Sequence, residues 1–357
     1  EAIQFHRAAS GMENQQFDLT ETGRLETISG DVNLRLGGSA VLRGVISAGG
    51  SLFVDAGTAV VADETSIATF GTSSLVSRAS GGSLSLIGLN DVRINSVIGG
   101  GNDELAVLRL ESIEGTLYLD REAGRITTGA KVNLGGKTLV LDGVIETTGE
   151  PDADGFDIVL GAASIKQGGT LNLNGSIKFV SSGDIVLQNL NLRLNNPGQK
   201  LGIEAGGNIF LGTTDPMDGD ATFRGVILQA NTLLQLTAGG LIHVGSDAQL
   251  FSTADDSLIQ LTATNVIVVG TVQAGARTDG ANVSAWTGRN AKVEIETTEA
   301  VVVGGKGLDA NFRLVNTGGT IAATGAVNIE TGSDSDGIGL TVSSSSAIYV
   351  DASGSGS

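Results

Sequence analysis

Aliphatic residues alternate with polar ones in short segments along the chain, and Gly, Asn, Asp or Ser separates one segment from the next. Clear examples are the segments 32–36, 116–120, 138–142, 170–174 and 292–296. A period of two places Leu139 with Leu141 on one buried face of a strand. The sole plausible helix runs from Asn102 to Ile113, and we assign it to strand because Leu108-Arg109-Leu110 also alternates. The pattern therefore predicts strands throughout.

Internal similarity indicates how these strands are arranged. The segment Gln235–Gly245 is identical to Gln260–Gly270 at seven of eleven positions. Gly-Gly pairs followed by an aliphatic residue recur at irregular intervals, starting at Gly135, Gly168, Gly206 and Gly239. Irregular periods of this kind are typical of stacked coils with loops of variable length, whereas propeller blades need a steadier period.

We therefore expect an all-β protein with a right-handed parallel β-helix, also called a β-solenoid. At about 19 to 25 residues a coil, the chain would make roughly 14 to 18 coils and an elongated rod about 70 to 85 Å long. Residues 25–352 are expected to form one continuous solenoid, residues 1–24 an N-terminal cap or ragged start, and residues 353–357 a Gly/Ser tail. A two-layer β-sandwich stays open as the alternative.

Composition removes several other classes. Hydrophobic residues make up 40% of the 357 residues, which is enough for a continuous core and argues against intrinsic disorder. The 54 Gly occur with only 3 Pro and no Cys, which excludes collagen and a disulfide scaffold. A net charge of −18 argues against nucleic acid. No apolar stretch is long enough to span a membrane, and no signal peptide is visible, so we expect an internal or processed start.

The same numbers agree with a solenoid. Aromatic residues are only 4% of the chain, with 1 Trp and 2 Tyr, as expected for a narrow interior filled by small aliphatic side chains. Glycine suits the corners, where the chain turns with positive φ, and Asn and Asp tolerate the same conformation.

Several coil-like stretches resemble those of filamentous-haemagglutinin-type bacterial surface proteins. They are the segments 44–56, 232–240 and 270–275. The resemblance extends over most of the chain, and it consists of a general residue pattern that many β-helical adhesins and giant repeat proteins share. It implies an extracellular bacterial β-solenoid with an adhesive or scaffolding role, and it brings no specific binding residue with it.

Acidic clusters beside glycine are the candidate metal sites. The first of them, with alternating aspartates around Gly155, resembles the opening of a calcium loop, in which hard oxygen ligands surround a hard cation. It lacks the Glu at position twelve that an EF-hand requires, and a solvated acidic corner is the favoured interpretation. The candidate calcium ligands are Asp152, Asp154, Asp157, Asp215, Asp218, Asp220, Asp334 and Asp336.

Catalysis is tested because polysaccharide lyases and hydrolases use β-helices with carboxylates on one coil face. Asp255-Asp256 is the only adjacent pair that fits such a pattern, and the accompanying basic segments are missing. His243 is expected to face outward on a strand, and His6 lies near the start of the chain. Trp286 and Tyr118 are isolated, although carbohydrate clefts usually carry several aromatic residues. We do not expect an enzyme.

The expected function is therefore structural: a stiff segment of a secreted or cell-surface bacterial adhesin or filament. Its partners would be other copies of itself or neighbouring segments of a longer chain, and cell-surface glycans are a further candidate. Calcium is the one cofactor considered. An end-to-end polymerising subunit and a polysaccharide-binding or polysaccharide-degrading β-helix are the alternatives.

Overall fold

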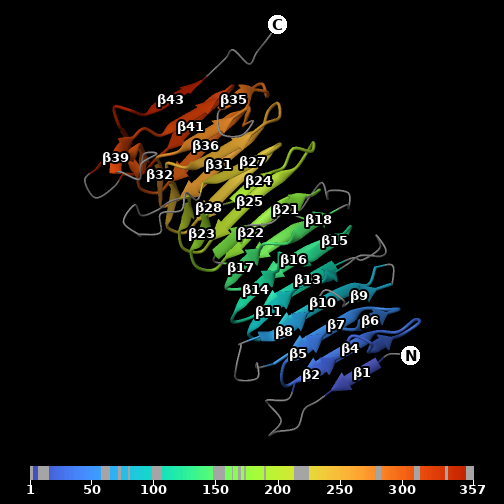
Figure 1. The fold of residues 1–357 in the computed structure, drawn as a ribbon. Helices are drawn as coiled ribbons and strands as arrows, with labels where there is room; N and C mark the ends of the chain where they lie inside the picture. Colours follow the sequence, from blue (N-terminus) through green and yellow to red (C-terminus); the bar gives the residue numbers. More distant parts are fainter. Residues whose placement is uncertain are drawn as a thin grey trace. The chain divides into compact units, whose positions relative to one another are not determined.

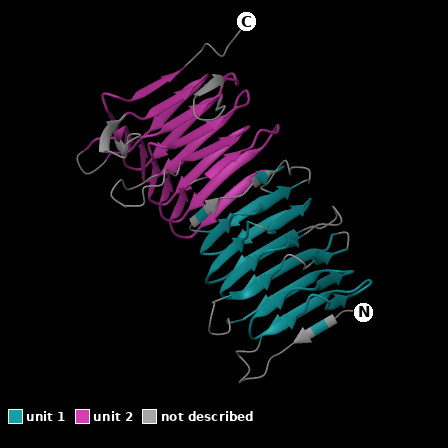
Figure 2. Ribbon diagram, in the orientation of Figure 1, with its two compact units in different colours: residues 1–175 teal, residues 176–357 magenta. Residues whose placement is uncertain are grey.

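The computed structural model describes most of the chain as short β-strands joined by turns (Figure 1). The described residues are 3–6, 16–57, 65–70, 74–78, 81–98, 107–121, 123–147, 157–162, 164–167, 170–172, 174–188, 190–212, 225–278, 283–308, 314–333 and 337–350. They divide into two compact units, residues 1–175 and residues 176–357 (Figure 2). Over these ranges we find no helix of sufficient length and apolarity to cross a bilayer.

The first unit has three strands per coil, and each strand belongs to one of three parallel faces, named A, B and C here. Face A contains β1 (Ile3–His6), β4 (Val32–Leu36), β7 (Leu52–Ala56), β10 (Ser83–Gly88), β13 (Val107–Ser112), β16 (Lys131–Gly135) and β19 (Ile158–Gly161). Face B contains β2 (Phe17–Leu19), β5 (Ala40–Leu42), β8 (Thr65–Thr69), β11 (Asp91–Ile94), β14 (Thr116–Leu119), β17 (Thr138–Leu141) and β20 (Ser164–Gln167). Face C contains β3 (Arg24–Glu26), β6 (Val45–Ala48), β9 (Ser74–Ser77), β12 (Val97–Ile98), β15 (Arg125–Thr128), β18 (Val144–Thr147) and β21 (Thr170–Asn172).

Aliphatic ladders fill the interior of this unit. Every second residue of a strand points inward and meets its counterpart one coil away in parallel register. One face-A ladder, exposed by no more than 2% at any step, consists of Val32, Leu52, Leu84, Leu108, Val132 and Ile158. Because one coil has no second layer to cover its aliphatic face, burial comes from stacking coil on coil.

The second unit repeats the arrangement with faces A, B and D. Face A contains β22 (Ile177–Ser181), β25 (Lys200–Ala205), β28 (Leu233–Ala238), β31 (Leu258–Ala263), β36 (Lys292–Thr297) and β41 (Ala326–Glu330). Face B contains β23 (Ile185–Gln188), β26 (Ile209–Leu211), β29 (Leu241–Val244), β32 (Asn265–Val268), β37 (Val301–Val303) and β42 (Leu340–Val342). Face D contains β24 (Leu190–Arg193), β27 (Val226–Ala230), β30 (Ala248–Ser252), β33 (Thr271–Ala274), β40 (Thr320–Ala323) and β43 (Ala347–Val350).

Two antiparallel hairpins are inserted into this unit, one between two coils, from β33 to β36, and one within a coil, from β37 to β40. The first pairs β34 (Ala276–Thr278) with β35 (Val283–Trp286), and the second pairs β38 (Gly305–Leu308) with β39 (Leu314–Thr317). Each hairpin is preceded by a glycine with positive φ, Gly275 at 81° and Gly304 at 97°, where a side chain would be strained. The prediction of an all-β parallel β-helix is confirmed, and Val107–Ser112 is a strand as assigned.

The repeat found in the sequence corresponds to two stacked coils, with one correction. On face A, Gln235 pairs with Gln260, as the identity predicts, and their side chains are hydrogen-bonded at 3.1 Å. On face B, Ile242 pairs with Val266, although the identity aligns it with Ile267. The register changes because two glycines join β28 to β29, whereas Thr264 alone joins β31 to β32.

Some coils are also longer than the sequence led us to expect. Ser83 N donates to Ser51 Oγ in the coil before, across a separation of 32 residues. Arg289 N donates to Asp255 Oδ1 across a separation of 34 residues. The described parts of the two units contain seven and six face-A strands, respectively, fewer than the expected number of coils. The ladders fix only the strands, so the connections between them can lengthen without disturbing the stack.

Candidate functional site

Of the eight aspartates predicted to bind calcium, the structure describes only Asp157. Its backbone oxygen accepts a hydrogen bond from Val132 N at 2.9 Å, which joins two coils. Gly175 lies so close that an added Cβ would be 2.9 Å from Asp157 Cβ. The other candidates lie outside the described residues: Asp152, Asp154, Asp215, Asp218, Asp220, Asp334 and Asp336. Within the described ranges, no three His, Asp or Glu side chains are grouped so that they could hold a metal ion. The calcium prediction stays a prediction.

A different set of Asp and Asn residues recurs at the corners, each at or shortly before the first residue of a strand. In each case Oδ1 accepts a hydrogen bond, 2.7 to 3.1 Å long, from a backbone N–H of the next coil. These corner Asx residues are Asp31, Asp91, Asp184, Asn208, Asp255 and Asn265. Side-chain oxygens of Asp and Asn readily accept bonds from nearby backbone N–H groups, so these residues fix one coil on the next where the ladder is interrupted.

Glycine in the next coil makes room for four of these side chains. A Cβ added to Gly50, Gly115, Gly207 or Gly240 would lie less than 3.0 Å from the Oδ1 atom of the corner residue in the coil before. Real Cβ atoms essentially never approach an atom so closely. This pairing was not predicted from the sequence. Its signal is an Asp or Asn preceding an aliphatic residue, with Gly one residue before the matching position of the next coil.

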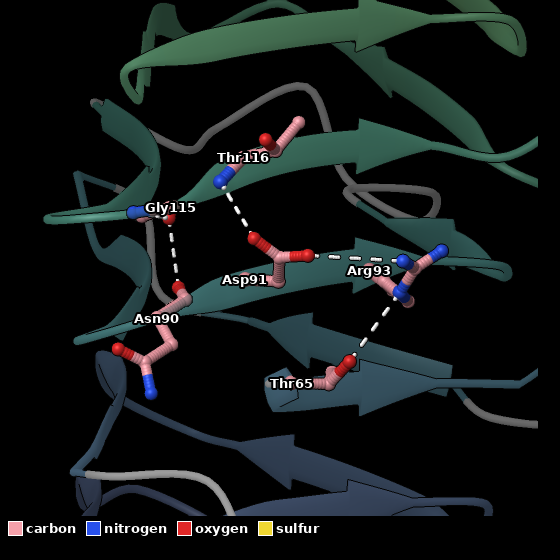
Figure 3. A network of polar contacts seen from close by, with 7 residues as sticks. Thr65, Asn90, Asp91, Arg93, Gly115 and Thr116 are labelled. Carbon is pink, nitrogen blue, oxygen red and sulfur yellow. Dashed lines mark hydrogen bonds and ion pairs between the residues drawn. The ribbon is translucent and has the colours of Figure 1, made fainter. Parts of the chain in front are cut away.

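A polar network that joins several coils lies on face B of the first unit (Figure 3). Asp91 Oδ1 accepts from Thr116 N at 2.8 Å in the next coil, and its Oδ2 lies 3.7 Å from Arg93 Nη2. Arg93 Nε donates to Thr65 Oγ1 at 3.3 Å in the coil before. The Arg93 guanidinium also lies over the Tyr118 ring, 4.0 Å from its centroid. Groups from three successive coils thus hold this arginine in one orientation.

Tyr118 therefore differs from the isolated aromatic residue expected from sequence. Arg93 covers one face of its ring, which is the surface that a sugar would need for stacking. Two further arginine–aromatic pairs occur in the first unit: Arg35 over Phe53 at 5.7 Å, and Arg43 over Phe70 at 4.9 Å. Arg93 and Tyr118 occupy the same strand position in successive coils, a signal that a coil-by-coil alignment would reveal.

The carboxyl of Asp120, which follows β14, has a pKa above its usual range. Burial raises the pKa of its carboxyl, the Arg93 guanidinium opposes the rise, and the carboxylate of Asp142 in the next coil adds to it. The pairing of Asp120 with Asp142 was not predicted from the sequence.

The two adjacent aspartates that were considered for catalysis form hydrogen bonds with the next coil. Asp255 Oδ1 accepts from Arg289 N at 2.8 Å, and Asp256 N donates to Arg289 O at 2.7 Å. Asp256 has a φ of 53°, in the left-handed region that Asp tolerates better than most residues. Both aspartates thus hold the turn of the next coil.

His243 faces outward on β29, as expected, between Phe210 and Ile267 of the neighbouring coils. Burial lowers the pKa of its imidazole, and Asp247 partly opposes this shift. Its Nδ1 is buried without a hydrogen-bond partner among the described residues. His6 lies on β1, but its side chain is outside the described part of the chain.

These observations define the class of the protein. It is a parallel β-solenoid whose coils are joined by aliphatic ladders inside and by Asx hydrogen bonds at the corners. Comparison with known protein families, with curated proteins and with solved structures finds no match to this chain.

Proposed function

We propose that the chain is a structural segment of a secreted or cell-surface bacterial adhesin or filament. In this role the stacked coils are a stiff element that supports adhesion, cell contact or an extracellular matrix. The surface location and the adhesive role come from the resemblance to filamentous-haemagglutinin-type proteins in the segments 44–56, 232–240 and 270–275.

One observation supports the mechanical part of the proposal: within each unit, neighbouring coils are bonded along their faces. Between β28 and β31, five successive residue pairs from Leu233 to Thr237 lie in parallel register. Backbone bonds of this kind lie along the stack, and the buried ladders prevent the strands from sliding, because a one-residue slip would move aliphatic side chains to the outside. Detaching one coil from the next must break the bonds of that interface together.

Single-molecule pulling between the ends of the chain tests this role. We expect the solenoid to resist force and then to lengthen in steps of about 20 to 35 residues, the length of one coil, since neighbouring coils are the cooperative units. Smooth lengthening at low force would contradict a load-bearing function. The surface location needs its own test, antibody labelling of intact and of permeabilised cells. Labelling that occurs only after permeabilisation would refute it.

A second candidate, a subunit that associates end to end, is favoured by the coil of β41, β42 and β43. Its inward positions Leu340, Val342 and Val350 are 45%, 45% and 49% exposed, whereas Val301 and Val303 one coil earlier are 0% exposed. Another copy, or a neighbouring segment of a longer chain, would cover these side chains and the strand edges beside them.

Light scattering at increasing protein concentration tests association between copies. We expect the average molecular mass of the parent chain to increase with concentration. The mass of Leu340→Glu should stay that of a monomer. Ile113→Glu is the matched control. Ile113 is 52% exposed and lies in a different coil, so its substitution should leave association unchanged. A monomeric parent chain at all concentrations would exclude this candidate.

Calcium binding by the acidic clusters is a separate proposal. A bound ion stabilises the folded state by mass action, so calcium should raise the unfolding temperature of the parent chain. The Asp152→Asn/Asp154→Asn variant should respond less, and an equal response to magnesium would indicate general screening of the −18 charge instead.

A further inference from the structure

Two carboxylates are stacked at one corner of the first unit. Asp120 follows Leu119 and Asp142 follows Leu141, and these two leucines are partners in register on face B. Backbone bonds fix both aspartates: Asp120 N donates to Ile94 O at 2.9 Å, and Asp142 N donates to Leu119 O at 3.0 Å. The two side chains therefore leave the same corner in consecutive coils and repel each other when both are charged.

The positively charged guanidinium beside these two carboxylates already contacts other groups. Arg93 on β11 lies over Tyr118 on β14 and is 3.7 Å from Asp91 Oδ2. Two further cations lie nearby in the chain: Arg121, exposed in the turn after β14, and Arg125 on β15, which forms an ion pair with Glu146 on β18. Of these, Arg93 is the cation that lowers the pKa of the Asp120 carboxyl, and the same guanidinium also lies beside the Asp91 carboxylate.

We propose that this corner, defined by Asp120 and Asp142, is a proton-sensitive contact between coils. When the pH falls, the Asp120 carboxyl takes a proton from solvent, the like-charge repulsion with Asp142 disappears, and the two coils bind each other more tightly. The device does not depend on the proposed mechanical function, because it follows from the stacking of two acidic side chains at a half-buried corner.

The direction of the effect follows from the pKa. Burial raises the pKa of Asp120 in the folded chain above its unfolded value, with Arg93 opposing and Asp142 assisting. The folded chain therefore binds this proton more strongly than the unfolded chain does. Its contribution to stability is fully present below the unfolded pKa and is lost as the pH rises through the folded pKa.

Carboxyl ¹³C NMR of the whole chain tests the proposal directly. We expect Asp120 to titrate at higher pH than the exposed aspartates, and its midpoint to fall in Asp142→Asn, where the neighbouring charge is absent. A midpoint at or below those of the exposed aspartates, or one that Asp142→Asn leaves unchanged, would overturn the proposal.

Hydrogen exchange gives a second readout at the corner. The amides of Asp142 and Gly143 both donate to Leu119 O, so their protection reports on this contact. At neutral pH we expect Asp120→Asn to slow their exchange several-fold relative to the parent chain. Glu114→Gln removes one exposed negative charge from another corner and should leave the exchange of the Asp142 and Gly143 amides unchanged. Equal exchange in parent and Asp120→Asn, or calcium protecting these amides as acid does, would refute a proton-specific contact.

Discussion

Gly207 lies one coil after Asp184, and its lack of a side chain makes room for that carboxylate. A Cβ there would be less than 3.0 Å from Asp184 Oδ1, which accepts bonds from Asn208 N at 2.7 Å and Asn208 Nδ2 at 3.0 Å. We expect Gly207→Ala to displace the carboxylate and to cost about 1–3 kcal/mol, the typical cost of leaving such polar groups unpaired.

Chemical denaturation measures this cost. Gly183→Ala is the matched control, because a Cβ at Gly183 meets nothing within 4 Å. A double-mutant cycle with Asp184→Ala isolates the clash, since the penalty for Gly207→Ala should shrink once the carboxylate is gone. Equal penalties for the two glycines would show that Asp184 does not require Gly207.

His243 offers a residue-scale test of pH dependence. Burial lowers its pKa in the folded chain, so the unfolded chain binds a proton first as the pH falls. Stability is therefore highest above the unfolded pKa of the imidazole, about 6.5, and is lost as the pH falls through the folded value. His243→Leu keeps an apolar contact with Phe210 and Ile267 and removes this titration.

We expect His243→Leu to raise the unfolding temperature more at pH 5 than at pH 8. Thermal melts of both chains at the two pH values measure the difference. A constant gain at both pH values would mean that the substitution acts through packing alone.

At this scale, sequence reasoning identified the outward position of His243 but not its unpartnered Nδ1. The role of Asp255 was also out of reach, because its partner, Arg289, is 34 residues away in the sequence. Alternation assigns a residue to a face of its own strand. The neighbour in the next coil depends on the length of every loop between them.

At the scale of elements, the aliphatic alternation fixes register within strands, whereas corners tolerate changes in length. Inserting one Gly between Val266 and Ile267 would turn Val268 away from the interior, where it is now 0% exposed. Inserting one Gly after Thr264 would leave the strand pattern intact and reproduce the two-residue connection that joins β28 to β29.

We expect the strand insertion to cost about 3 kcal/mol or more, the scale of losing a buried aliphatic side chain. The corner insertion should cost about 1 kcal/mol or less, because loop length enters the free energy only weakly. Denaturant titration of both variants measures the contrast. Similar costs would indicate that the corner hydrogen bond from Thr264 Oγ1 to Gly239 O, 2.8 Å long, is as important as the ladder.

The strands themselves were predictable because period-two alternation is a local property of the chain. Coil lengths were not, since they depend on connections that no local pattern limits. The offset between the two similar segments is right for Gln235 and Gln260 but wrong for Ile242, because identity at Ile267 outweighed the burial that selects Val266.

At the scale of the whole molecule, a solenoid should lose or gain complete coils more easily than parts of coils. Deleting residues 234–258 joins Leu233 to Ile259 and places Leu261 where Leu236 now faces Ile203. Face A then continues without a gap, and Val272 can replace Leu250 on face D. We expect this variant to keep the circular dichroism per residue of the parent chain and to unfold cooperatively.

Deleting residues 234–246 removes half a coil and is the control. Strands that now belong to one face would then stack on strands of a different face, and the inward aliphatic ladders would be interrupted. We therefore expect cooperative unfolding to be lost. If both deletions unfold alike, long-range contacts outside the nearest-neighbour coils must contribute to stability.

The one-residue corner between β31 and β32 has a historical consequence. If the coil from Gln235 and the coil from Gln260 arose by duplication, the residue lost at the corner left no trace in the buried ladder. Ancestry in such a chain is therefore recorded separately on each face. Descendants compared by overall identity would appear misaligned by one position on face B, whereas comparison of inward-facing positions, strand by strand, would recover their common origin.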